Sequence, residues 1–317
     1  MQQTRVSATL ALILVAGACA PAENEEMREH LNPLVTLHEA NTPQFGLYTP
    51  GAMNRATTPP EAVAAAERAA QTMSYGMSDY VFDGSMERGV DAGLPTFLEL
   101  RDAMQAAGAT AATHPFVVKM AKISDQEQTT RDVAAQLDAG VSGIMFVEVE
   151  TAEEARMGLD AMRYVSEGGT RPDRVGSAPA YWGVDEVEYR ERADLWPLDP
   201  EGDLVSWVIV ESHEGLANVR EIAAVPGIGV LWPGAGTLRG LFSTMDDDGR
   251  RVLDEEAWEN AIQQVLSACK EFDVPCGFPS NASDIEMRME QGFSVFVMGW
   301  GDSGFETVEM GRELASR

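Results

Sequence analysis

The stretch Val208-Ile209-Val210-Glu211, followed after a helical segment by Leu231-Trp232-Pro233-Gly234-Ala235-Gly236-Thr237, decides the fold of this chain. It predicts a buried strand that ends in a single carboxylate, then a helix, a second buried strand and a glycine-rich turn. Parallel α/β barrels keep their catalytic groups at the carboxyl ends of their strands. We therefore expect Glu211 to lie at the functional site.

Similar apolar runs continue in both directions from this stretch and alternate with helical segments. None has the period-two pattern of a half-exposed strand, so we expect a parallel sheet that is buried on both faces. Eight such strands in 317 residues fit one (β/α)8 TIM barrel, the simplest α/β fold of this length. The predicted strands are residues 44–48, 80–83, 116–120, 143–147, 205–210, 228–232, 276–278 and 293–298.

Helical periodicity between the strands completes the alternating order. Thr151 and Glu154 have the pattern of a capping box, so a helix is expected to begin there. Residues 168–203 are the longest stretch without clear periodicity, and we expect them to form a lid or an interface element. Further helices are predicted at residues 59–73, 94–107, 125–139, 255–272, 282–290 and 305–315.

The amino terminus has the pattern of an export signal. Arg5 precedes an apolar run over residues 6–15, which is too short to span a bilayer but fits a signal peptide. The small residues before Cys19 resemble the lipobox of bacterial lipoproteins, with ordinary cleavage or a misassigned start as alternatives. We expect a signal peptide at 1–18, a lipid acceptor at Cys19, an acidic tether at 19–33 and the barrel at 34–317. The protein would then lie in the periplasm or on a membrane of the cell envelope.

The composition limits which classes of partner and metal ion are expected. With a formal net charge of −28, the protein has too few basic side chains to neutralise a phosphate backbone or an anionic lipid surface. We therefore do not expect it to bind nucleic acid, or to bind anionic lipid by charge. With only four histidines, any bound metal would be Mg or Mn held mainly by carboxylates. Cys19, Cys269 and Cys276 form no disulfide framework and no zinc motif, and we expect Cys269 and Cys276 to be small core residues.

Four ordered motifs carry a resemblance to a known family. They are Asp83-Gly84-Ser85-Met86-Glu87-Arg88-Gly89, Leu137-Asp138-Ala139-Gly140, Val149-Glu150-Thr151-Ala152-Glu153-Glu154-Ala155 and Val175-Gly176-Ser177-Ala178. Together they make residues 34–315 similar to the HpcH/HpaI aldolase and citrate lyase family. The resemblance implies a TIM barrel of the phosphoenolpyruvate/pyruvate-domain type.

The resemblance also implies a metal-dependent chemistry. In the family, one Glu and one Asp hold a divalent cation, Mg or Mn, which chelates a 2-oxo acid and stabilises its enolate. Glu211 falls on the metal-binding Glu, whereas Thr237 stands where the Asp is expected. Asp83 is therefore a candidate for the missing metal ligand. The catalytic arginine and histidine of the family align with Lys119 and Arg88, and neither replacement is chemically equivalent.

Each candidate also has a plainer interpretation. Glu211 would otherwise be a helix cap or a salt-bridged carboxylate, Asp83 a strand-end cap, and Lys119 a solvated or salt-bridged cation. Gly234, Gly236 and Thr237 would bind substrate in a close turn, or the glycines would only serve a tight loop with positive φ. Ser177, in the last family motif, is a further substrate-binding candidate.

Two functions remain open at this point. The first is a carbon–carbon lyase of the aldolase class, which acts on a small 2-oxo acid through a metal-stabilised pyruvate enolate. The second is a related barrel that binds an organic acid in the cell envelope, with altered chemistry or without catalysis. Family members commonly assemble through their last helices, so a homo-oligomer is expected in either case.

Overall fold

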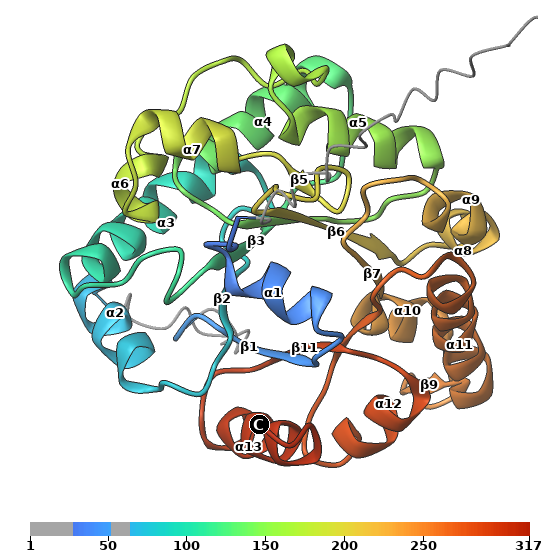
Figure 1. Ribbon diagram of the computed structural model, residues 1–317. Coiled ribbons are helices and arrows are strands. Elements are labelled where there is room, and N and C mark those ends of the chain that lie inside the picture. The colour runs from blue at the N-terminus through green and yellow to red at the C-terminus, as the bar shows by residue number, and fades with distance from the viewer. Residues whose placement is uncertain (1–27, 52–63) are drawn as a thin grey trace, which may run out of the picture.

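The structure, a computed structural model, describes residues 28–51 and 64–317. Its centre is a curled parallel sheet of nine strands, and helices surround this sheet as an outer ring (Figure 1). The predicted α/β class and the parallel arrangement are confirmed. The predicted signal peptide, Cys19 and the first part of the tether lie outside the described residues.

The elements follow the expected alternation. The strands are β1 (Gln44–Tyr48), β2 (Tyr80–Asp83), β3 (Phe116–Met120), β4 (Gly143–Phe146), β5 (Leu195–Trp196), β6 (Leu204–Val210), β7 (Val230–Pro233), β8 (Ser243–Met245), β9 (Arg251–Leu253), β10 (Gly277–Pro279) and β11 (Val295–Met298). The helices are α1 (Pro33–Glu39), α2 (Ala65–Ser74), α3 (Val90–Ala106), α4 (Gln126–Asp138), α5 (Ala152–Met162), α6 (Ala178–Trp182), α7 (Glu186–Arg192), α8 (His213–Ala217), α9 (Val219–Ala223), α10 (Ala235–Leu241), α11 (Glu255–Phe272), α12 (Ile285–Gln291) and α13 (Asp302–Leu314), with a 3₁₀ turn at Val165–Glu167.

The strand order explains why strand-end residues meet. The order is β10-β11-β1-β2-β3-β4-β6, with β7 and the short β5 also paired to β6, and every pair in this sheet is parallel. An isolated parallel bridge pairs Leu231 of β7 with Cys276, directly before β10. Because all strands of this sheet run parallel, they end at one common carboxyl edge.

Large side chains fill the inside of the sheet. Tyr80, Trp207 and Trp232 pack ring against ring, with centroids 5.2 Å apart for Tyr80–Trp207 and 5.3 Å apart for Trp207–Trp232. A buried aromatic side chain removes roughly 150–250 Å² from water, so the interior is a packed core rather than a channel. The same cluster includes Leu34, Val35, Phe82, Val117, Met145, Val147, Val205, Ile209, Val230, Val295 and Val297.

Helix α1 covers the amino end of the sheet, where Figure 1 shows it lying across the centre of the ring. Its Leu34 and Val35 are fully buried in the inner cluster, and its His38 stacks on Trp196 with ring centroids 5.1 Å apart. Burial lowers the pKa of His38 from 6.5 to about 3, so the imidazole is neutral in the folded protein near neutral pH.

This histidine gives a prediction for stability against pH. Below pH 6.5 the unfolded chain protonates His38 whereas the folded protein does not, so stability contributed by the neutral ring is lost as the pH falls toward about 3. At pH 5 we expect this group to remove about 2 kcal/mol from the free energy of unfolding. Urea titrations at pH 7 and pH 5 measure the loss. His38→Phe, which keeps an aromatic ring against Trp196, should lose less between the two pH values; equal losses would contradict the assignment.

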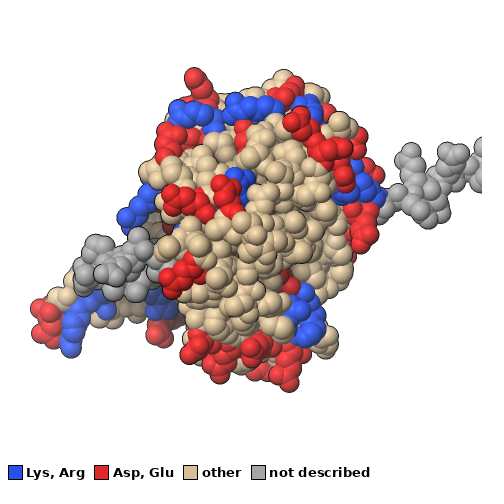
Figure 2. Space-filling model, turned by 90° about the vertical axis from the view of Figure 1, so that its left-hand side faces the viewer, with Lys and Arg blue, Asp and Glu red and all other residues tan. Residues whose placement is uncertain are grey.

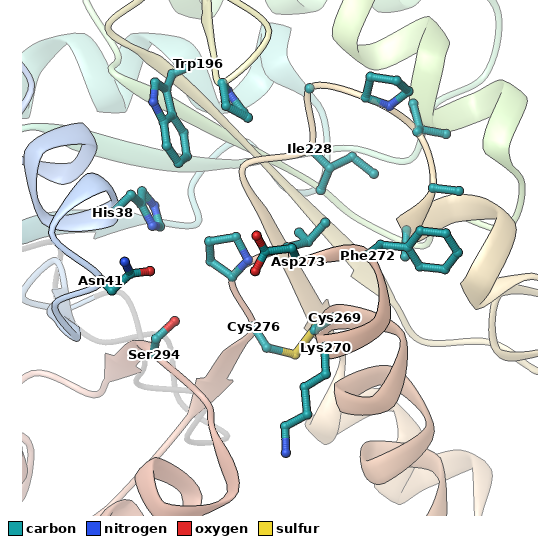
Figure 3. A pocket seen from close by; sticks show the side chains of 18 of the residues that line it. His38, Asn41, Trp196, Ile228, Cys269, Lys270, Phe272, Asp273, Cys276 and Ser294 are labelled. Carbon is teal, nitrogen blue, oxygen red and sulfur yellow. A yellow bond between two sulfur atoms is a disulfide. The ribbon is translucent and has the colours of Figure 1, made fainter. Parts of the chain in front are cut away.

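A disulfide joins Cys269 of α11 to Cys276 before β10 (Figure 3). Their Cα atoms are 5.7 Å apart and both residues are 2% exposed. Both cysteines therefore lie in the core as expected, but the expectation that they form no disulfide is wrong. The chain reverses between them because Asp273 ends α11 in a left-handed conformation with φ 54°.

Residues 168–203 are not a lid over the carboxyl edge. They contain α6, α7 and β5, and their aromatic side chains are buried. Trp182 donates to the carbonyl of Gly140, and Tyr189 donates to that of Leu137, at the loop that leads into β4. The segment thus packs near the amino edge. The short helices of this segment were not predicted because its sequence mixes polar and apolar residues without a clear period. Buried aromatic side chains pack these helices against the rest of the protein.

The end of the predicted tether contacts the fold. Arg28 donates to the backbone carbonyl of Glu191, and His30 and Asn32 both contact the buried carboxylate of Asp203. The folded unit therefore includes residues before 34. Within residues 28–51 and 64–317, no helix combines the length and apolar character of a membrane span. On the side that carries α2, α3 and α6, acidic and basic side chains lie mainly around the rim (Figure 2).

Candidate functional site

Glu211 directly follows β6 and lies at the carboxyl edge of the sheet. The backbone N–H of Glu148, which follows β4, donates to Glu211 Oε1 over 3.1 Å. The helix α8 is capped by Ser212, whose hydroxyl accepts from Gly215 N over 3.0 Å, so Glu211 is not the cap. Among the described residues no cation lies within ion-pair distance of Glu211, which leaves its carboxylate available for chemistry.

The surroundings of Glu211 shift its titration. Burial raises the pKa of Glu211, while a hydrogen bond from Thr237, the charge of Lys119 and the Glu148 N–H act in the opposite direction. Burial is the larger effect, so the carboxyl group holds a proton at higher pH than a solvated glutamate does. A half-buried carboxyl with a raised pKa is suited to moving a proton.

Lys119 supplies the positive charge at this edge. Its Nζ lies 3.2 Å from Glu87 Oε1, and its side chain is 17% exposed. Burial alone would lower the pKa of Lys119, but the charges of Tyr48, Glu87 and Glu211 and the hydrogen bond that Lys119 donates to Glu87 together raise it. Lys119 is therefore a cation at neutral pH and is unsuited to act as a neutral nucleophile. The salt bridge to Glu87 agrees with the interpretation of Lys119 as a salt-bridged cation. It does not prevent Lys119 from also stabilising negative charge on a substrate.

The glycine turn packs directly on Glu211. A Cβ at Gly234 would lie 2.3 Å from Glu211 Cβ and 2.5 Å from its Oε2, so only glycine fits beside the carboxylate. Gly234 has φ −71°, which rules out a need for positive φ as the reason for this glycine. Gly236 has open space where a Cβ would be, and Thr237 is exposed and hydrogen-bonded to Glu211. The structure thus places Gly234 and Thr237 in contact with Glu211.

Both carboxylate oxygens of Asp83, the candidate for the second metal ligand, have partners within the protein. One carboxylate oxygen accepts from Thr49 Oγ1 over 2.9 Å and faces Arg68 at 3.5 Å. The other accepts from the backbone and the hydroxyl of Ser85. With 1% exposure and both oxygens engaged, Asp83 organises the strand end, as its plainer interpretation holds.

Arg88 and Ser177 are also not brought into the site. Arg88 is exposed on the turn between β2 and α3, one residue after Glu87. Ser177 accepts from Arg101 Nη1 over 3.0 Å and lies 3.2 Å from the carbonyl of Asp138, at the amino edge of the sheet. The prediction that Ser177 binds substrate is therefore corrected, because it stands at the opposite end of the strands from Glu211.

Three residues that the sequence did not single out lie at the site. Tyr48 ends β1 and interacts electrostatically with Lys119. Glu148 takes a left-handed conformation with φ 50°, which is uncommon for a residue other than glycine and aims its N–H at Glu211. Lys122 pairs with Glu150 at 2.5 Å. Of these three residues, only Tyr48 could have been found from the sequence, because it stands at the end of a predicted strand.

The donor set does not fit the two-carboxylate metal site that the resemblance implies. No group of three or more His, Cys, Asp and Glu gathers in a metal-holding arrangement in the part of the chain that the structure describes. Thr237, at the position of the expected Asp, donates its hydroxyl to Glu211, and Asp83 is engaged elsewhere. A hydroxyl group does not replace a carboxylate as a charged ligand for a hard cation.

Two cavities lie at opposite edges of the sheet. One of about 860 Å³ opens at the amino edge, where His38, Trp196, Asp273 and the disulfide surround it (Figure 3). It contains none of the predicted site residues. A smaller cavity of about 310 Å³ opens at the carboxyl edge, beside the ends of β10 and β11. Because barrel chemistry takes place at the carboxyl edge, the larger cavity is not the predicted site.

Known proteins share this fold. Residues 63–303 match the family described as HpcH/HpaI aldolase/citrate lyase. A solved HpcH/HpaI aldolase/citrate lyase family protein from Burkholderia cenocepacia superposes with a TM-score of 0.62 at 21% identity, covering 90% of this chain and 98% of that one. The macrophomate synthase structure superposes with a TM-score of 0.55 at 20% identity, covering 90% of this chain and 87% of that one.

Curated relatives are aldolases. A 2-dehydro-3,6-dideoxy-6-sulfogluconate aldolase from Pseudomonas putida is 28% identical over 50% of this chain and 57% of its own length. A hydroxypyruvate/pyruvate aldolase from Paraburkholderia phytofirmans is 28% identical over 51% of this chain and 59% of its own length. The chain thus spans little more than half the length of these relatives. The family match, in contrast, covers most of the chain, which therefore belongs to the HpcH/HpaI aldolase/citrate lyase family.

Proposed function

We propose that this protein is a carbon–carbon lyase of the aldolase class that acts on a small 2-oxo acid. The observation that carries the proposal is the pair of Lys119 and Glu211 at the carboxyl edge, a half-buried cation that interacts electrostatically with a carboxyl group of raised pKa. Membership in an aldolase family and relatives named as pyruvate and sugar-acid aldolases support the reaction class.

Each residue has a role that follows from its charge. Cleavage of the C3–C4 bond of a 4-hydroxy-2-oxo acid leaves the electron pair on C3 as an enolate, and Lys119 stabilises the negative charge that develops on the keto oxygen. Glu211 takes the proton from the C4 hydroxyl, which becomes the carbonyl of the released aldehyde, and returns it to C3 of the enolate. Gly234 leaves room for the Glu211 side chain, which packs directly against it. No step runs through a metal ion, because the donor set does not fit one.

The second candidate, a barrel that binds an organic acid without turning it over, is favoured by one observation. Thr237 stands against Glu211 where a carboxylate is expected, so the site lacks the charge that would hold an activating cation. Both candidates predict binding of a 2-oxo acid at Lys119, and only the lyase predicts product.

A lysine series tests the binding role. Lys119→Met should lower kcat/KM for a 4-hydroxy-2-oxo acid by about 10²–10³, since a preorganised charge at the reacting oxygen is removed. Lys119→Arg, which keeps the charge, should recover most of that loss. Lys270→Met is the matched control, because Lys270 lies on α11 beside the cavity at the amino edge, away from Glu211. Equal effects of Lys119→Met and Lys270→Met in a coupled assay for pyruvate release would remove Lys119 from the site.

We further infer that the sheet closes as a complete (β/α)8 barrel. The pairing of Leu231 with Cys276, and the bond of 2.9 Å from Leu231 N to the carbonyl of Pro275, support closure between β7 and β10. An experimental structure with a gap between these strands would contradict it.

We also propose that the protein is exported and anchored through Cys19. The apolar run before Cys19 supports an export signal, and the disulfide between Cys269 and Cys276 suits an oxidising compartment. Cell fractionation tests the anchor: the wild type should sediment with membranes, and Cys19→Ser should appear in the soluble fraction. An equal distribution of both would contradict the lipid anchor.

A further inference from the structure

The cavity at the amino edge is large enough to hold a small organic molecule. Its volume of about 860 Å³ falls within the range of roughly 300–1,000 Å³ that is typical of small-molecule sites. It lies between the end of α1, the chain after β5 and the reversal from α11 to β10. The strands place Glu211 at the opposite edge, so a ligand in this cavity would not contact the residues assigned to the lyase reaction.

Polar side chains from separate elements point into this cavity. Figure 3 shows the carboxylate of Asp273 and the amide of Asn41 directed toward one common space, with the hydroxyl of Ser294 beside them. Asp273 and Asn41 follow α11 and α1 in left-handed backbone conformations, with φ 54° and 49°. Asp and Asn adopt this conformation more readily than most residues. The turns that end two helices thus direct a carboxylate and an amide into the same cavity.

The charged side chains of the cavity favour a cation. Glu39 and Asp273 contribute two carboxylates, and Lys270 is the one Lys or Arg among the described residues that line it. In Figure 3, Lys270 extends away from Asp273. It lies against Gly292, where a Cβ would be 3.5 Å from Lys270 Nζ. The ammonium group of Lys270 therefore does not occupy the space that the Asp273 carboxylate faces.

The helix ends around the cavity add to this preference. The 18-residue α11 ends next to Asp273, and the shorter α1 ends at Glu39. The last carbonyl groups of a helix carry the negative end of its dipole, which attracts cations. Both the side chains and the backbone of the lining therefore make the cavity favourable for positive charge.

Apolar side chains form much of the remaining lining. Trp196, which stacks on the neutral His38, stands across the cavity from Asn41, and Leu198 and Ile228 lie nearby. An aromatic ring together with a carboxylate is a combination that binds organic ammonium ions. A metal ion is less well suited, because no group of three or more His, Cys, Asp and Glu within residues 28–51 and 64–317 could hold one.

We propose that this cavity binds an organic cation, a protonated amine on an apolar skeleton. The carboxylate of Asp273 accepts hydrogen bonds from the ammonium group, and the side-chain oxygens of Asn41 and Ser294 are further acceptors. Trp196 and Leu198 contact the apolar part of the ligand. The proposal involves neither Lys119 nor Glu211, so it stands independently of the lyase function.

Calorimetric titration with three compounds of one shape tests the preference for positive charge. They are 2-phenylethylammonium chloride, the neutral 2-phenylethanol and the anionic sodium 3-phenylpropionate. We expect saturable binding of the ammonium ion in the millimolar range, binding about tenfold weaker for the alcohol, and no binding of the carboxylate. No saturable binding of the ammonium ion, equal binding of the ammonium ion and the alcohol, or binding of the carboxylate would overturn the proposal.

Two pairs of variants locate the bound ammonium ion. Asp273→Asn keeps the size of the side chain and tolerates the left-handed backbone, and it should weaken binding about tenfold. Asp247→Asn, in the exposed turn between β8 and β9, is its matched control and should bind as the wild type does. Leu198→Arg places a like charge at a 44% exposed position of the lining and should abolish binding, whereas Leu241→Arg on α10 should not. In either pair, a cavity variant that binds as its control does would overturn the site.

Discussion

Glu211→Gln is expected to lower kcat/KM for cleavage of a 4-hydroxy-2-oxo acid by about 10³, within the range found when a general acid–base is removed. The amide keeps the size of the side chain and its contact with Gly234, so the fold should be retained. Glu214→Gln, an exposed glutamate three residues further along the chain, is the matched control and should keep wild-type activity. Similar rates for the two variants would remove Glu211 from the reaction.

The pH profile gives an independent view of the same residue. The pKa of Glu211 is raised above 4.5, so the ionised form, and with it kcat/KM, should be lost on the acid side at a pH above 4.5. Thr237→Val removes a hydrogen bond that lowers this pKa, so the acid limb should move to higher pH. An acid limb at the same pH in both proteins would show that another group controls it.

Thr237→Asp is expected to create a metal site. Thr237 and Glu211 are hydrogen-bonded, so an aspartate at position 237 would place a second carboxylate beside the first. Two carboxylates are the kind of ligand that Mn²⁺ and Mg²⁺ prefer, and we expect Mn²⁺ affinity to rise about 100-fold over the wild type. Electron paramagnetic resonance of free Mn²⁺ measures the change without any substrate.

Two variants control this gain. Thr237→Asn has the size of the aspartate without its charge and should bind Mn²⁺ no better than the wild type. Adding Glu211→Gln to Thr237→Asp should cancel the gain, because only one carboxylate remains. A wild type that already binds Mn²⁺ as tightly as Thr237→Asp would contradict the conclusion that the donor set does not fit a metal.

The strands were predictable because a buried parallel strand is a short, continuous apolar run. The predicted ranges 44–48, 80–83 and 116–120 coincide with β1, β2 and β3, and residues 255–272 coincide with α11. Helix α3 begins four residues before its predicted start because Gly93 and Pro95 are typical of loops, whereas here Gly93 packs against the carbonyl of Ser85. The hairpin of β8 and β9 was not predicted.

The site was only partly predictable, for reasons of backbone conformation and register. Glu211 was found from its position at a strand end, and Lys119 from its alignment with the arginine of the family. Glu148 was missed because a left-handed glutamate leaves no sequence signal. Asp83 and Ser177 were placed by motif similarity, and local hydrogen bonds engage both.

Pyruvate release from a panel of 4-hydroxy-2-oxo acids, measured with the purified protein after chelation and again with added Mn²⁺, decides whether Lys119 and Glu211 cleave the substrate without a metal ion. We expect saturable release after chelation, with kcat/KM lowered by about 10²–10³ in Lys119→Met and by about 10³ in Glu211→Gln. Release that depends strictly on added metal, or no release from any acid of the panel, would contradict it.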